Sequence, residues 1–282
     1  MPKLRIASNN IWNMDNNYPN WQEKGENCSA EARMPGIARA FDELHPDVIG
    51  LQEASHKGVD CLQTELLARG LRYAVHWTRF TSILYRPELF EVLDSEYLLY
   101  PEEMEGFPGL SYNDCRSKSL NAVVLRCKED GKIFVLGNTH LWWKPSDPAH
   151  DRYQEGSAEA RAYQVGLASE IIARYQEKYS APAFFLGDMN DGYDSAPIAK
   201  ALSLGFSHAH DVATEYASEE NGYHFCYPIG HKPYVPGPFC EAIDHILVRG
   251  LPEGAVRRFD RYTPEYFETL SDHYPVYVDV EW

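Results

Sequence analysis

The segment Phe184-Phe185-Leu186-Gly187-Asp188-Met189-Asn190 contains a short apolar run that ends in a carboxylate and a carboxamide. A run of this length that is rich in large apolar residues is typical of a buried strand, so its polar end is expected at the edge of a sheet. The same pattern recurs at Val48–Glu53, which ends in a carboxylate, and at Phe134–His140, which ends in an imidazole. Repeated strands that end in reactive side chains indicate a site along one edge of a layered α/β fold.

Three more polar sites adjoin strand-like segments. Ile6–Asn10 ends in an amide, Asp244 begins the run up to Val248, and Asp272 and His273 precede the last strand-like segment. Taken singly, a polar residue beside a strand is more often a solvated loop residue than a catalytic one. Six such sites, each next to a predicted core strand, together predict one polar crevice. The collected groups are oxygen donors and two imidazoles without a thiolate, which suits a hard cation such as Mg²⁺ or Mn²⁺.

Strand-like and helical segments alternate along the chain without a repeat or a linker, so we expect a single catalytic domain over residues 1–282. The predicted strands are Leu4–Asn9, Val48–Gln52, Ser82–Arg86, Asn121–Arg126, Ile133–Asn138, Ala183–Gly187, Ala242–Val248 and Pro275–Val280. The predicted helices are Ala30–Leu44, Val59–Arg69, Glu159–Tyr179 and a short one near Pro197–Ser203. Segments 100–118 and 216–241 resist assignment, and long irregular loops in a compact domain are usually functional or disordered.

The composition disfavours several classes of protein. The chain has 26 Lys and Arg against 42 Asp and Glu, a net charge of −16, and no basic cluster, which argues against long DNA or RNA as the main ligand. No apolar run is long enough to span a membrane, and the N-terminus leaves no room for a signal peptide. We therefore expect a cytoplasmic protein, and a monomer. The six cysteines are interpreted as reduced thiols, with Cys226 and Cys240 the pair to check.

In this order, the polar segments resemble the Mg²⁺-dependent endonuclease/exonuclease/phosphatase superfamily. The matching motifs are Leu51-Gln52-Glu53, Asn138-Thr139-His140-Leu141, Gly187-Asp188-Met189-Asn190, Ile243-Asp244-His245-Ile246 and Ser271-Asp272-His273-Tyr274-Pro275. Each motif is common alone, but the ordered set covers nearly the whole chain and is specific. The resemblance implies a four-layered α/β sandwich in which two packed mixed β-sheets are flanked by helices. It also implies that Glu53 is the principal ligand of one or two Mg²⁺ or Mn²⁺ ions, supported by Asn10 and Asp272.

The same resemblance implies catalytic roles for five residues. Asp188 would orient and deprotonate the attacking water, and Asn190 would bind a phosphate oxygen or help to hold the nucleophile. His273 would contact the phosphate, with Asp244 fixing its tautomer and favouring its protonated form. His140 would be a second donor to the phosphoryl group or to the leaving oxygen.

The resemblance is least informative about the residues that contact the substrate. Arg116 is expected to reach the substrate phosphate, with a structural ion pair as the alternative. Trp142 and Trp143 stand where many bacterial relatives have Asp-His, and they either stack on a ring of the substrate or pack in the core. His224 lies in the 216–241 loop, which we expect to form a second wall of the cleft.

These observations predict a metal-dependent phosphoesterase that hydrolyses a phosphodiester or phosphomonoester of a small molecule or a nucleotide. The first alternative is an endo- or exonuclease that acts on DNA or RNA. A catalytically inactive binding module is a third reading, and the presence of every expected acidic and imidazole group disfavours it. The sequence leaves open the substrate, the leaving group and the number of metal ions, because a fold position specifies chemistry rather than a substrate.

Overall fold

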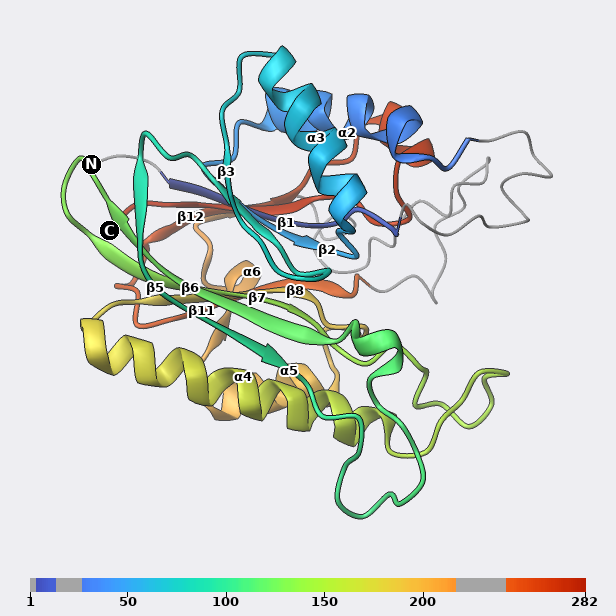
Figure 1. The fold of residues 1–282 in the computed structure, drawn as a ribbon. Coiled ribbons are helices and arrows are strands. Elements are labelled where there is room, and N and C mark those ends of the chain that lie inside the picture. Colours follow the sequence, from blue (N-terminus) through green and yellow to red (C-terminus); the bar gives the residue numbers. More distant parts are fainter. Residues whose placement is uncertain (1–3, 14–26, 217–241) are drawn as a thin grey trace.

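The apolar runs form the strands of two mixed sheets that pack face to face in the computed structural model, which describes residues 4–13, 27–216 and 242–282. Helices cover the outer face of each sheet, so the molecule has four layers (Figure 1). This arrangement confirms the predicted four-layered α/β sandwich. Within the described residues, no helix combines the length and the apolar character that crossing a membrane requires.

One sheet has seven strands, in the order β10-β12-β13-β1-β2-β4-β3. Their bounds are β10 Glu215–Tyr216, β12 Val256–Arg261, β13 Val276–Val280, β1 Leu4–Asn10, β2 Val48–Gln52, β4 Ile83–Tyr85 and β3 Ala74–His76. The central strands β1 and β2 are parallel, with Asn10 opposite Gln52. Their carboxyl ends therefore reach the same edge of the sheet.

The other sheet has six strands, in the order β5-β6-β7-β8-β11-β9. Their bounds are β5 Phe90–Leu99, β6 Ser119–Cys127, β7 Ile133–His140, β8 Ala183–Asp188, β11 Asp244–Arg249 and β9 Ser207–His208. Here β7 and β8 are the parallel central pair, with His140 opposite Asp188. The antiparallel strand β11 starts opposite the end of β8, which places Asp244 beside Asp188.

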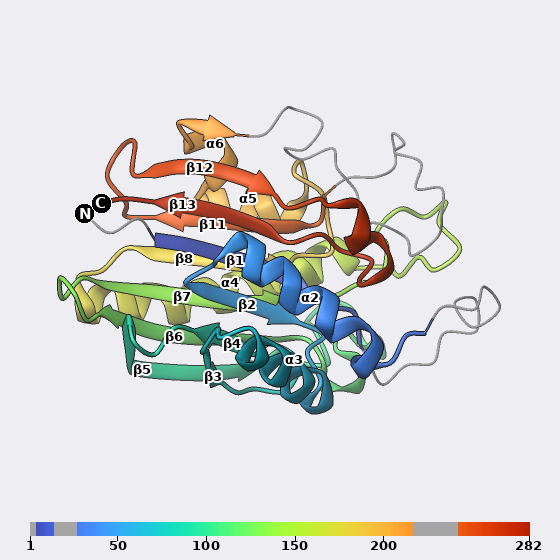
Figure 2. The ribbon, with the colours of Figure 1, turned by 90° about the horizontal axis from the view of Figure 1, so that it is seen from above.

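Helices α2 (Ala30–Leu44) and α3 (His56–Ala68) lie across the seven-stranded sheet, as Figure 2 shows from above. Helices α4 (Ser157–Tyr179) and α5 (Ala196–Ser203) cover the six-stranded sheet. Short helical turns follow at η1 (Asp114–Arg116), α6 (Ala209–Val212) and η2 (Glu265–Thr269). Between the sheets, side chains such as Phe134, Phe184 and Leu186 are fully buried, and each contributes roughly 1.5–3 kcal/mol of hydrophobic stabilisation.

The strands that the sequence did not predict are the polar or short ones. β5 is the edge strand of its sheet, and much of it is only partly buried, so charged residues interrupt its apolar pattern. β12 reads Val-Arg-Arg-Phe-Asp-Arg, in which the charged residues mask the apolar alternation. β3, β9 and β10 have only two or three residues. Each of these strands depends on pairing with a neighbour rather than on its own pattern.

A buried polar layer joins the two sheets directly below the strand ends. The Gln52 Nε2 atom donates to the Asn138 Oδ1 atom at 2.6 Å, and the Asn138 Nδ2 atom donates to the carbonyl oxygens of Leu51 at 2.9 Å and Ser82 at 3.1 Å. Both amides are fully buried, so these bonds are not replaced by water and fix how the sheets meet. Two residues of the predicted motifs therefore hold the site from below.

Gly187 lets β7 and β8 approach closely at the same level. Its φ is +140°, and a Cβ atom at this position would lie 1.9 Å from the carbonyl oxygen of Thr139. Only glycine avoids this clash with backbone. The next residue, Asp188, is thereby held at the end of β8, opposite His140.

Candidate active site

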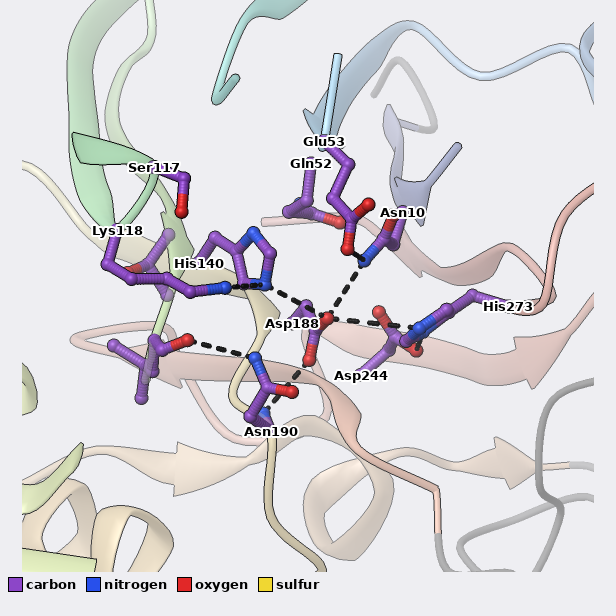
Figure 3. Close-up of polar contacts among 12 residues, drawn as sticks. Asn10, Gln52, Glu53, Ser117, Lys118, His140, Asp188, Asn190, Asp244 and His273 are labelled. Carbon is purple, nitrogen blue, oxygen red and sulfur yellow. Dashed lines mark hydrogen bonds and ion pairs between the residues drawn. The ribbon is translucent and has the colours of Figure 1, made fainter. Parts of the chain in front are cut away.

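The two parallel strand pairs end together, and the predicted polar residues meet there (Figure 3). Asn10 links the two sheets: its Nδ2 atom donates to Asp188 Oδ2 at 2.9 Å and to Glu53 Oε1 at 3.2 Å. The backbone N–H of Asn13 donates to Glu53 Oε2 at 2.9 Å, so both carboxylate oxygens of Glu53 accept a hydrogen bond. The prediction that Asn10, Glu53 and Asp188 lie in one site agrees with this geometry.

The donor set fits a hard divalent cation. Ligand oxygens of Glu53 and Asp188 lie within 4.8 Å of each other, and the buried Asp272 Oδ1 atom has no hydrogen-bond partner among the described residues. Burial, together with the Glu53 and Asp188 carboxylates, raises the pKa of Asp272 to about 7 although His273 lowers it. A cation among these oxygens would relieve their mutual repulsion. Glu53 and Asp272 are therefore the residues that could hold a divalent cation. The predicted ligand Asn10 directs its Nδ2 atom at the carboxylates, and its Oδ1 atom accepts from the backbone N–H of Trp12 at 2.9 Å, so this arrangement does not offer its oxygen to a cation.

His273 and Asp244 form a short hydrogen bond on the other side of Asp188. The His273 Nδ1 atom lies 2.6 Å from Asp244 Oδ2, and its Nε2 atom faces Asp272 Oδ1 at 3.8 Å and Asp188 Oδ2 at 3.9 Å. Burial by itself would lower the pKa of His273, but these three carboxylates raise it well above its usual value. His273 is thus an imidazolium whose Nε2–H points toward the centre of the site.

Asp188 is held from both sides by hydrogen bonds. Its Oδ1 atom accepts from the backbone N–H of Asn190 at 2.9 Å, and its Oδ2 atom accepts from Asn10. Asn190 adopts a left-handed backbone with φ of 53°, and its Nδ2 atom donates to the carbonyl of Leu141 at 2.9 Å. Burial and the Asp244 carboxylate raise the pKa of Asp188, while His273 and Lys118 lower it, and together they leave it at about 6. The carboxylate is therefore ionised at neutral pH.

Lys118 also belongs to the site although no sequence motif identified it, and its Nζ atom lies 2.6 Å from His140 Nε2. Lys118 is buried in the site, whereas the predicted Arg116 is exposed two residues earlier in η1. The predicted strand started at Asn121, but β6 starts at Ser119, so Lys118 fell into a segment without an assignment. A polar residue just before a strand that starts at the site is the same signal that identified Asp244.

Strained backbone conformations with positive φ are concentrated around the residues of the site. Eight described non-glycine residues have a positive φ, and two of them, His45 and Ser180, are ordinary left-handed helix caps. The other six adjoin strand ends at the site or the turn before Lys118: Trp12, Glu53, Phe80, Cys115, Arg116 and Asn190. Such conformations cost about 1–3 kcal/mol each and cluster at functional sites.

The two tryptophans that were candidates for substrate contact, Trp142 and Trp143, differ in their surroundings. Trp142 is 1% exposed and packs against Tyr112 and Ala160, so of its two predicted roles the structure favours packing in the core over a contact with substrate. Its position directly after Leu141 turns the ring into a small apolar cluster under the 100–118 loop. Trp143 is half-buried, and its Nε1–H donates to Asp114 Oδ2 at 2.7 Å. His224 lies outside the described residues, as do Cys226 and Cys240; the cysteines at 61, 115 and 127 are free thiols.

Comparison with solved structures agrees with the fold. An endonuclease/exonuclease/phosphatase family protein from Bacteroides thetaiotaomicron superposes with a TM-score of 0.72 at 20% identity, covering 99% of this chain and 98% of that one. A mannosyl-6-phosphatase from the same organism gives 0.70 at 20% identity, covering 99% and 100%. TDP2 from D. rerio, complexed with a single-strand DNA product, gives 0.66 at 19% identity, covering 99% of each chain. A search of curated protein sequences gave no significant match.

The sequence itself matches the model of one family over most of its length. The matched residues, 11–273, include Glu53, His140, Asp188, Asp244 and His273, which the structure brings to one edge of the two sheets. The ordered motifs, the four-layered sandwich and the family match agree. The chain belongs to the endonuclease/exonuclease/phosphatase family.

Proposed function

We propose that the protein is a metal-dependent phosphoesterase that hydrolyses a phosphodiester or phosphomonoester of a small molecule or nucleotide. The observation that carries this proposal is the hydrogen-bonded convergence of Asn10, Glu53 and Asp188 with the Asp244–His273 pair. It combines a carboxylate site for a cation, an ionised base and an imidazolium in one place. Together these three parts support metal-assisted attack of water on a phosphate ester.

The ionised Asp188 is the residue that would accept a proton from the attacking water. Asn10 and Asn190 donate to its two oxygens, which fixes the direction in which its remaining lone pairs point. Its pKa of about 6 leaves it ionised at neutral pH yet basic enough to take a proton. The Mg²⁺ or Mn²⁺ held by Glu53 and Asp272 would supply a Lewis acid for a phosphate oxygen.

The imidazolium of His273 would donate from Nε2 to a phosphoryl oxygen. Asp244 accepts from Nδ1 at 2.6 Å, which sets the ring orientation and keeps the ring charged as negative charge grows on the phosphoryl group. Since Asp188 and His273 face each other at 3.9 Å, the water and the phosphoryl group would lie between them and the cation. All these groups come from different strand ends, so the fold rather than one motif assembles the site.

The alternative activity is that of a nuclease. The observation in its favour is the structural likeness to TDP2, which was solved with a single-strand DNA product. The net charge of −16 argues against it, because binding to a polymer draws its affinity from neutralised phosphates. Turnover of an oligonucleotide should fall steeply between 50 and 200 mM salt if the polymer is the substrate, whereas turnover of a small ester should change little. An inactive binding module would turn over neither.

A screen of phosphate esters with Mg²⁺ and Mn²⁺ tests the proposal, using Glu53→Gln as the decisive variant. Loss of the principal metal ligand should abolish Mg²⁺-dependent thermal stabilisation and lower activity by about 100-fold or more. Asp60→Asn, which neutralises an exposed carboxylate on α3, is the matched control and should behave as wild type. An unchanged metal titration in Glu53→Gln would refute the assignment.

A further inference from the structure

The contact between Lys118 and His140 constrains which of them carries the proton. Their nitrogens are 2.6 Å apart, so one must donate and the other accept. An ammonium group has three donors and no lone pair, so a charged Lys118 requires the Nε2 atom of His140 to be the acceptor. The Nδ1 atom of His140 has no partner among the described residues, so the tautomer is decided at Nε2, where Lys118 Nζ at 2.6 Å is closer than Asp188 Oδ2 at 3.4 Å.

The surroundings place the shared proton on Lys118. Burial lowers the pKa of Lys118, but the carboxylates of Glu53, Asp188 and Asp114 oppose that effect. The pKa of His140 is lowered well below its usual value by burial and by the neighbouring cations Lys118 and His273. His140 is therefore neutral with its hydrogen on Nδ1, and its Nε2 atom has no proton to give to a substrate.

Lys118 is within reach of the reacting group. His140 Nε2 is 3.4 Å from Asp188 Oδ2, so the Lys118 Nζ atom lies no more than about 6 Å from the carboxylate that would orient the attacking water. The backbone of Lys118 is fixed, because its N–H donates to Asn113 Oδ1 at 2.9 Å and its carbonyl accepts from Asn113 Nδ2 at 2.9 Å. Figure 3 shows the Lys118 side chain pointing to His140, and His140 pointing to Asp188.

We infer that Lys118 is a catalytic residue that donates from Nζ to a non-bridging phosphoryl oxygen, and that His140 is a positioning residue that holds the ammonium through Nε2. This inference rests on the proposed phosphoesterase function and changes the expected role of His140 from donor to acceptor. The ammonium has two further N–H donors besides the one directed at His140. A fixed cation beside the phosphoryl group stabilises the charge that develops in the transition state.

The first experiment determines the tautomer of His140 by NMR and does not depend on enzymatic activity. Nitrogen-15 chemical shifts of the imidazole of His140, assigned with a His140→Gln variant, should show a neutral ring protonated at Nδ1 in the metal-free wild type at pH 7. Lys118→Met keeps a long apolar side chain but removes the charge and the donors, and it should release this tautomer preference. A wild-type ring protonated at Nε2 overturns the inference.

The second experiment measures turnover and binding of inorganic phosphate. Lys118→Met should lower kcat/KM for an aryl phosphate by about 10²–10³-fold and weaken competitive inhibition by phosphate, while Mg²⁺ affinity changes less than about threefold. Lys118→Arg, which keeps a cation, should recover most of the loss. Lys200→Met makes the same change at an exposed position of α5 and should match the wild type.

A double-mutant cycle separates a positioning role from an independent donor. If His140 acts through Lys118, the Lys118→Met/His140→Ala double variant should be no slower than the slower single variant, whereas independent donors would multiply their losses. If the losses multiply, or if Lys118→Met keeps a kcat/KM within about threefold of wild type, the inference about Lys118 is overturned while the proposed function stands. A wild type that hydrolyses no phosphate ester with Mg²⁺ or Mn²⁺ removes the proposed function and this inference with it.

Discussion

Acid should destabilise the protein through a buried pair of neutral imidazoles behind the site, His208 and His245. The His245 Nε2–H donates to the carbonyl oxygen of Asp191 at 2.8 Å, so its Nδ1 atom is left to accept from His208 Nε2 at 3.0 Å. The His208 Nδ1 atom accepts in turn from the backbone N–H of His210 at 3.2 Å. Each ring nitrogen of the pair has one partner only while both rings stay neutral. An added proton must therefore break a bond.

The magnitude follows from the pKa of His245, which burial lowers to about 4. The unfolded chain binds the same proton with a pKa near 6.5, so it holds more protons than the folded state between these values. Stability from this residue is thus complete above pH 6.5 and is lost as pH falls toward 4. The full difference is about 3 kcal/mol, of which about 2 kcal/mol is lost by pH 5. Burial also lowers the pKa of His208, with the same sign.

Urea unfolding at pH 7.5 and pH 5.0 measures this loss, with His245→Gln as the test variant. The loss of unfolding free energy should be about 2 kcal/mol smaller in His245→Gln than in the wild type. This comparison between variants is needed because His273, with its raised pKa, contributes in the opposite direction. His56→Gln, at an exposed position, should follow the wild type. If His245→Gln does not fold, His208→Gln gives the same test, and a loss equal to that of the wild type would refute the reasoning.

Three further perturbations test the geometry around the site. Asp244→Asn should lower the pKa of His273, followed by NMR titration, and reduce kcat by about 10²-fold with a smaller change in KM; an unchanged titration would contradict the pair. Asn138→Ala leaves buried partners without hydrogen bonds, so urea unfolding should show a loss of about 2–4 kcal/mol, against less than about 1 kcal/mol if the amide layer is dispensable. Gly187→Ala places a Cβ atom 1.9 Å from the Thr139 carbonyl oxygen. It should lower the melting temperature by several degrees, since each kcal/mol of lost unfolding free energy lowers it by about 2–4 °C. A wild-type melting temperature would show that β7 and β8 can move apart to admit the methyl group.

Elements with strong local patterns could be predicted from the sequence. β2 and α2 have the predicted bounds, and β7 and β8 differ from them by one or two residues. Their apolar residues are buried on both faces or on one regular stripe, so the hydrophobic pattern of the segment itself reports its environment. β5 and β12 could not be predicted in this way, because they are stabilised by pairing with β6 and β13.

The sequence by itself identified Glu53, Asp188 and His273 as reactive groups of the site, because they stand beside apolar runs in a family-specific order. The tertiary structure decided their roles and the contacts that motifs do not encode. Lys118 and His140 are 22 residues apart and meet only because β6 and β7 pair with Ser119 opposite His140. Trp142 is close to the site in sequence yet is buried away from solvent. Which side chain reaches the site depends on register and packing between distant strands, and a linear pattern does not carry that information.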